Sequence, residues 1–142
     1  MSAKRVRRNT ALKYRGLGHR SGTAVVEFAL CLPLILAMVF GVVQTSNAIY
    51  LQQALTAAAY EAGNIVCVTG GTSTTAMSNA NAVLTAMRVA SPTVTIAPTV
   101  TNNTTTGTEI TITCSAPLSS NSLIFGFLGD RTLQAKLVTQ RL

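Results

Sequence analysis

A single carboxylate stands inside the most apolar part of the chain, at a short fixed distance from a glycine. In the stretch SGTAVVEFALCLPLILAMVFGVV, residues 21–43, Glu27 is the only charged residue, and it follows Gly22 by five positions. Because an ionised group is costly in a hydrocarbon environment, a carboxylate in such a run is a candidate functional group. The alternative is that Glu27, about one helical turn from the start of the run, reaches back to water.

The element that carries Glu27 has the length of a membrane-spanning helix. Residues 24–43, at about 1.5 Å per residue, would cover about 30 Å, the thickness of the hydrocarbon layer of a bilayer. Pro33 interrupts the run and removes the amide that would bond to the carbonyl of Ala29, so we expect a kink there. Such a kink is either harmless or a weak point that lets the segment leave the bilayer and repack against other helices.

The net charge of +7 is confined to the N-terminal leader. Seven of the 11 basic residues precede Ser21, whereas the rest of the chain has four basic and four acidic residues. Beside an apolar run, Lys and Arg mark the cytoplasmic side of a membrane, so we predict a cytoplasmic N-terminus and an outer C-terminal part rather than nucleic-acid binding. The charged fraction of 11% is well below the usual value of about 25% for soluble domains.

The residues around Glu27 resemble those of a known protein family. A basic leader ends at Gly22, Thr23 opens the next segment, and the string VEFALCLP, residues 26–33, places Phe28 directly after Glu27. This pattern is similar to that of the TadE-like proteins, minor pseudopilins of the tight-adherence (Tad) pilus in the type IV pilus superfamily. The resemblance continues through residues 41–63, weakens after about residue 71 and returns in the closing RTLQAKLVTQRL.

The resemblance implies that a prepilin peptidase in the inner membrane cuts between Gly22 and Thr23. Gly suits the position before the cut because it lets backbone approach closely. The cut creates an α-amine on Thr23 with a pKa of about 7.7–8.0, largely cationic at neutral pH. Glu27, then the fifth residue, could neutralise that amine in its own or an adjacent subunit, with an attraction that grows as water is excluded.

The outer part of the chain is expected to form an α+β domain. The first helix should continue past residue 43, since Ala48, Leu51, Leu55, Ala58, Ala62 and Ile65 form a stripe of alternating three- and four-residue spacing. Gly70 and Gly71 should end it. A short helix is predicted over residues 76–89, and alternating patterns predict strands over residues 93–97, 108–116 and 131–140. The apolar stretch SLIFGFLG, residues 122–129, is expected to be irregular and to cap the core or form a contact patch.

The three cysteines sort by compartment. Cys31 lies in the apolar run, where a thiol is a small apolar filler. Cys67 and Cys114 belong to the outer part, where an oxidising environment permits a disulfide. We predict a Cys67–Cys114 bridge, and the alternative is two buried free thiols.

No constellation of catalytic residues is visible. The only histidine, His19, lies in the leader, and neither Glu109 nor Asp130 belongs to a recognised motif. There is no phosphate-binding glycine loop and no metal-ligand spacing. We therefore predict a structural protein that needs no metal or cofactor.

These observations predict a leader (1–22), a transmembrane and assembly helix (23–43) and an extracytoplasmic domain (44–142). The family resemblance implies a single-pass protein of the bacterial inner membrane whose partners are the prepilin peptidase, other pilins and pseudopilins and the pilus assembly platform. The alternative is an uncleaved, signal-anchored envelope protein with a partner-binding outer domain. A secreted domain released after Ser46-Asn47-Ala48 is a third hypothesis, because that tripeptide resembles a signal-peptidase site.

Overall fold

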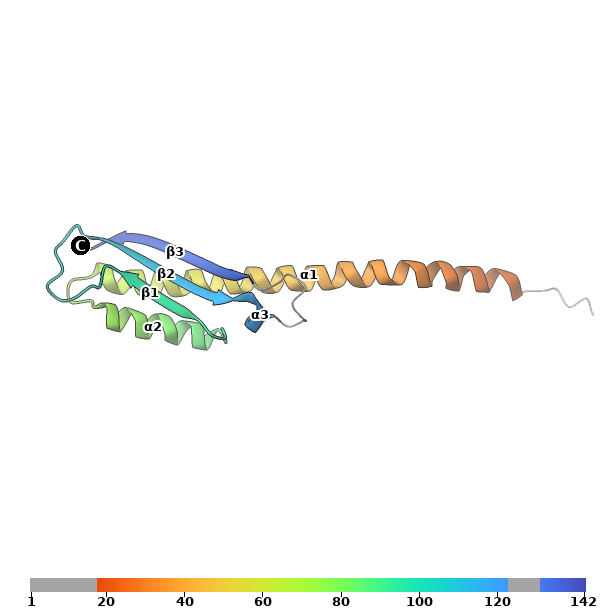
Figure 1. Ribbon diagram of the computed structural model, residues 1–142, viewed down its shortest axis with the longest axis horizontal. Coiled ribbons are helices and arrows are strands. Elements are labelled where there is room, and N and C mark those ends of the chain that lie inside the picture. Colours follow the sequence, from red (N-terminus) through yellow and green to blue (C-terminus); the bar gives the residue numbers. More distant parts are fainter. Residues whose placement is uncertain (1–17, 123–130) are drawn as a thin grey trace, which may run out of the picture. The chain divides into compact units, whose positions relative to one another are not determined.

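The computed structural model describes residues 18–122 and 131–142, with side chains from residue 22 onward. The chain divides into two compact units, residues 1–38 and 39–142. The described elements, labelled in Figure 1, are α1 (Gly18–Cys67), α2 (Ser73–Ala86), β1 (Thr93–Ala97), β2 (Glu109–Pro117), α3 (Leu118–Asn121) and β3 (Thr132–Gln140). The predicted α+β architecture of a long apolar helix, a short helix and a three-stranded antiparallel sheet is confirmed.

The sheet forms where the sequence alternates between apolar and hydroxyl side chains. Its order is β1-β2-β3, and both pairs are antiparallel. Along β2, Ile110, Ile112 and Cys114 are buried, whereas Thr111 and Thr113 between them are half-exposed. One face of the sheet therefore belongs to the core, and the other is a polar surface. The three predicted strands are observed to within one residue at either end.

The second half of α1 and the whole of α2 cover the apolar face of the sheet (Figure 1). The predicted stripe is confirmed, since Leu51, Leu55, Ala58 and Ala62 are at most 2% exposed. Its alanines allow the helix to approach the strands closely. At Gly63 even a methyl group would meet the Leu137 side chain, 2.6 Å from its Cδ2 atom.

Helix α2 runs from Ser73 to Ala86, three residues before the predicted range of 76–89 at either end. Its two ends show why. Thr72 is the N-cap, and its hydroxyl accepts a hydrogen bond from the Thr75 amide at 3.3 Å, which starts the helix at Ser73. At the other end, the amides of Arg88 and Val89 donate to the carbonyls of Thr85 and Leu84. This pair of bonds is a Schellman motif, which ends the helix before Val89.

The region between β2 and β3 differs from the sequence analysis at one point and lies partly outside the description. No residue pattern predicted α3, a single turn that follows β2 directly. The apolar stretch 122–129, expected to cap the core or to form a contact patch, lies outside the described residues from position 123 onward.

The predicted disulfide between Cys67 and Cys114 is wrong, because both are free thiols. Cys67 Sγ lies 2.8 Å from Thr139 Oγ1, and Thr139 pairs with Ile110 in the sheet. Cys114 is four residues further along β2, a separation of about 13 Å, whereas bridged residues have Cα atoms within about 7 Å. The two thiols lie at different levels of the sheet.

Candidate functional site

The residues predicted to be cut and to assemble lie together at the start of the apolar half of α1. Gly22, Thr23, Glu27 and Phe28 are all exposed. Glu27 follows Thr23 by four positions in the helix, which corresponds to a rise of about 6 Å and a net rotation of about 40°, so both side chains share one face. A carboxylate on this face is correctly spaced to neutralise a charge at Thr23.

No part of the chain that the structure describes covers the apolar half of α1. Every residue from Gly22 to Val43 is exposed, including Phe28, which is 62% exposed, and Leu30, which is 75% exposed. Within the described ranges, one helix, Gly22–Cys67, is long and apolar enough to cross a membrane, and its most apolar 18-residue window is entirely unburied. The helix is thus compatible with a single membrane span, and a signal sequence near an N-terminus has the same character.

Pro33 lies inside α1, and the helix continues through it. Because proline has no amide hydrogen, the carbonyl of Ala29 lacks its usual helical donor. Both residues are exposed among the residues that the structure describes.

The other end of α1 is held by an arginine that directly follows the last strand. Arg141 is only 4% exposed, and its guanidinium donates to the carbonyl of Gly71 at 3.0 Å and that of Val66 at 3.5 Å. The last turn of α1 has no basic residue of its own, and a cation is favourable beside the unpaired carbonyls of a helix C-terminus. Arg141 therefore fixes where the helix ends relative to the sheet.

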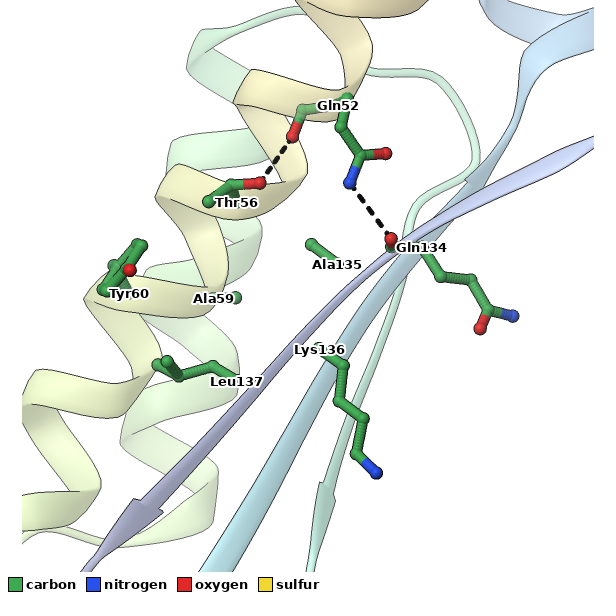
Figure 2. Close-up of a pocket in the computed structure, with 8 residues that line it drawn as sticks. All are labelled: Gln52, Thr56, Ala59, Tyr60, Gln134, Ala135, Lys136 and Leu137. Carbon is green, nitrogen blue, oxygen red and sulfur yellow. Dashed lines mark hydrogen bonds between the residues drawn. The ribbon is translucent and has the colours of Figure 1, made fainter.

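A groove runs between α1 and the edge strand β3 (Figure 2). Its cavity of about 190 Å³ is lined by Gln52, Thr56, Ala59, Tyr60, Gln134, Ala135, Lys136 and Leu137. Gln52 Nε2 donates to the carbonyl of Gln134 at 3.1 Å, and Figure 2 shows Lys136 pointing away from α1. The described residues on its walls include no carboxylate, imidazole or thiol. Gln52 pairs with a carbonyl of the edge strand that would otherwise lack a partner.

A larger cavity, of about 390 Å³, lies at the end of the 39–142 unit where α1 enters it. Asn47, Tyr50, Leu51, Met87, Arg88, Val89 and Asn121 line it. Asn121 closes one side, since its Oδ1 accepts from the Ala90 amide at 2.6 Å and its carbonyl accepts from Asn47 Nδ2 at 2.6 Å. Tyr50 OH donates to the Met87 carbonyl at 3.1 Å. The loop after α2 is thereby fastened to α1 on one side and to α3 on the other.

This loop contains the two residues other than glycine with positive φ within the described ranges. Arg88 has φ of 56° and Ser91 has φ of 51°. Each costs on the order of 1 kcal/mol, because the side-chain Cβ crowds the backbone there. Arg88 occupies the C′ position of the Schellman motif, where glycine is usual.

The geometry holds no metal-binding constellation, since no group of three or more His, Cys, Asp or Glu side chains is gathered among the residues described. Burial raises the pKa of the Cys114 thiol to about 11, which keeps it protonated and unreactive. The described residues thus combine an exposed apolar helix with a small α+β domain.

Residues 22–64 match the model of the TadE-like protein family, so this segment of the chain is similar to TadE-like proteins. The matched range begins at the predicted cut and runs through the apolar half of α1 into the part packed on the sheet. This family is a pilin-like structural family and not an enzyme family. No curated protein and no solved structure matches the chain significantly.

Sequence reasoning missed three residues that organise the outer domain. Arg141 carried a weak signal, as a lone cation just after an alternating strand near the end of the chain. Arg88 and Asn121 carried none, because their roles depend on a left-handed turn and on contacts across 31 or more residues.

Proposed function

We propose that the chain is a minor pseudopilin-like structural protein that a prepilin peptidase cuts between Gly22 and Thr23 and that is needed to assemble a Tad-type adhesive pilus. The observation that carries this proposal is the family match, which begins at Gly22 and includes an apolar helical segment that none of the described residues covers. Such a helix requires either lipid or neighbouring helices, and a pilin-like protein uses them in succession.

Cutting at this bond requires α1 to open locally, because the Gly22–Thr23 bond lies inside the helix. Gly22 makes the opening easier, since glycine is about 1 kcal/mol less favourable than alanine in a helix. No neighbouring side chain crowds it, because a Cβ built on Gly22 would meet nothing within 4 Å.

After cleavage, the amine of Thr23 and the carboxylate of Glu27 form the charge pair of the mature N-terminus. Leaving either charge alone in an apolar bundle is strongly unfavourable, whereas a close pair offsets much of the desolvation cost. The one-turn spacing on a single face supports pairing within the chain, and the exposure of both residues supports pairing between subunits.

The proposed location is the inner membrane, with the leader in the cytoplasm and residues 44–142 outside. The partners are the prepilin peptidase, other pilins and pseudopilins and the assembly platform. Release of a soluble domain after Ala48 is disfavoured, since that cut would sever α1 where Asn47 is already bonded to Asn121.

Sequencing the N-terminus of the mature protein tests the proposal. Thr23 is the expected first residue, and Gly22→Leu should block processing while membrane insertion continues. An intact leader would support the uncleaved envelope anchor, and an N-terminus at Ile49 would support secretion. Normal processing of Gly22→Leu would overturn the peptidase assignment.

A matched pair of variants tests the role of Glu27. Glu27→Gln keeps the shape but removes the charge, and it should be processed and inserted yet fail to support piliation. Glu109→Gln removes a carboxylate from the exposed start of β2 and should leave piliation unchanged. Normal piliation with Glu27→Gln would mean that the carboxylate simply reaches water.

A further inference from the structure

The cavity beside Asn47 and Tyr50 lies close to the point where the apolar run ends. Val43 is the last residue of that run, and Asn47 and Tyr50 follow it on α1 by four and seven positions. In a helix these positions lie about 6 Å and 10 Å beyond Val43. The polar headgroup layer on each side of a bilayer is about 5–8 Å thick, so Asn47 falls at headgroup depth and Tyr50 lies just beyond it if the run spans the membrane.

The lining of the cavity combines one free cation with an apolar wall. Arg88 is exposed, and its guanidinium makes no hydrogen bond to any residue that the structure describes. The side chains of Leu51, Met87 and Val89 supply apolar surface, and the ring of Tyr50, which is 49% exposed, is of the kind enriched at membrane interfaces. The amide groups of Asn47 and Asn121 are already occupied by backbone partners.

A second, independent observation is the backbone at Arg88. At φ of 56° a glycine would be preferred for folding alone, and backbone strain of this kind clusters at binding sites. The strained position carries an outward cation in place of the residue that would relieve the strain.

We propose that this cavity binds the headgroup phosphate of an anionic phospholipid from the leaflet next to the outer domain, with Arg88 as the cation. The phosphate diester meets the guanidinium, and the glycerol end of the lipid lies against the apolar wall. The site would fix the outer domain at one height on the membrane surface before assembly. The inference rests on the proposed membrane span.

The test uses the full chain, purified from detergent with an equimolar mixture of phosphatidylglycerol and phosphatidylcholine and examined by native mass spectrometry. A basic residue near an anionic surface contributes about 1 kcal/mol, so the wild type should retain phosphatidylglycerol about fivefold more selectively than Arg88→Gly. Lys136→Gln, which removes one charge from the exposed face of β3, should keep the wild-type selectivity. The leader is the same in all three chains and cancels from the comparison.

Arg88→Gly also separates binding from folding. Because glycine relieves the left-handed strain, the variant should melt at a higher temperature than the wild type while losing its lipid preference. If the guanidinium served only the C-terminus of α2, Arg88→Gly would melt lower in every lipid and keep the wild-type selectivity, and the proposal would be wrong. An equal loss of selectivity in Lys136→Gln would also overturn the proposal, because the preference would then depend on overall charge and not on Arg88.

Two controls distinguish the remaining outcomes. Inorganic phosphate added in excess should not displace the retained phosphatidylglycerol, and displacement would assign the site to a free anion instead of a lipid. Co-elution of each chain with lipid nanodiscs reports membrane insertion separately. Failure to insert would contradict the proposed span, whereas insertion without a selectivity change at Arg88 would overturn the lipid site alone.

Discussion

Without the Arg141 side chain, the outer domain should open far more often, because this one side chain holds the end of α1. The guanidinium bonds to the Gly71 carbonyl at 3.0 Å and reaches the Val66 carbonyl at 3.5 Å, the limit for such a bond. A hydrogen bond from a charged donor contributes about 1.5–3 kcal/mol, and a partly buried cation at a helix C-terminus adds up to about 2 kcal/mol. The contact with Val66 is long, so we count its contribution as small. Arg141→Met should then lower the free energy of opening by about 3 kcal/mol, which is about a 100-fold change in the opening equilibrium.

The chain contains its own probe for this measurement. Cys114 is 0% exposed, so it reacts with a thiol reagent only when the domain opens. In the full chain in detergent micelles, with Cys31→Ser and Cys67→Ser, the modification rate of Cys114 at fixed pH should rise about 100-fold on Arg141→Met. Arg141→Lys should fall between the two, since lysine keeps the charge and loses the planar fork.

Lys136, an exposed cation on β3, provides the control. Lys136 is exposed, so Lys136→Met should leave the rate of Cys114 modification unchanged. If Arg141→Met reacts as slowly as its parent, the helix end is held by the sheet alone and the assignment of Arg141 is wrong.

Three further outcomes are expected. Burial raises the pKa of Cys114 from its ordinary 9.0 to about 11; the unfolded chain therefore ionises first, and the free energy of unfolding should fall between about pH 9 and pH 11 by at most about 2–3 kcal/mol. Urea titrations should show that loss in the wild type and less of it in Cys114→Ala. Gly71→Ala should destabilise the domain by about 2 kcal/mol or more, because the added methyl would meet the Ile65 carbonyl oxygen; Gly41→Ala, with nothing within 4 Å, should melt like the wild type. Reduction should leave the gel mobility of Cys31→Ser unchanged, and a shift would mean that the other two thiols are paired.

The elements that the sequence predicted best are those with strong periodicity. Each strand was recognisable because alternate residues belong to the core and to the polar face, as at Ile110 and Thr111. The long helix was recognisable from its apolar run and its alanine stripe. The boundaries of α2 were displaced because they depend on the cap at Thr72 and on the turn at Arg88, and capping is a geometric property that several residues in this polar stretch could have supplied.

The disulfide prediction failed for a related reason. Compartment and chain length favoured a bridge, but neither says where the end of a helix meets a strand. That meeting point is set by the sheet register and by the hydrogen bond between Cys67 and Thr139, which place Cys67 about four strand residues from Cys114.

The sequence alone determined the class of fold and the likeness to TadE-like proteins, because both depend on local signals: the order of residue types around Glu27, the length of the apolar run and the alternation in the strands. Tertiary structure decided which side chains meet. It brought Arg141 to Val66 at the end of α1, across 75 residues. It placed Cys67 and Cys114 apart although the sequence had predicted a bridge, and it placed Arg88 and Tyr50 in the lining of one cavity. Contacts of this kind depend on how packed elements are registered against one another, and a pattern of residue types along the chain carries no record of that register.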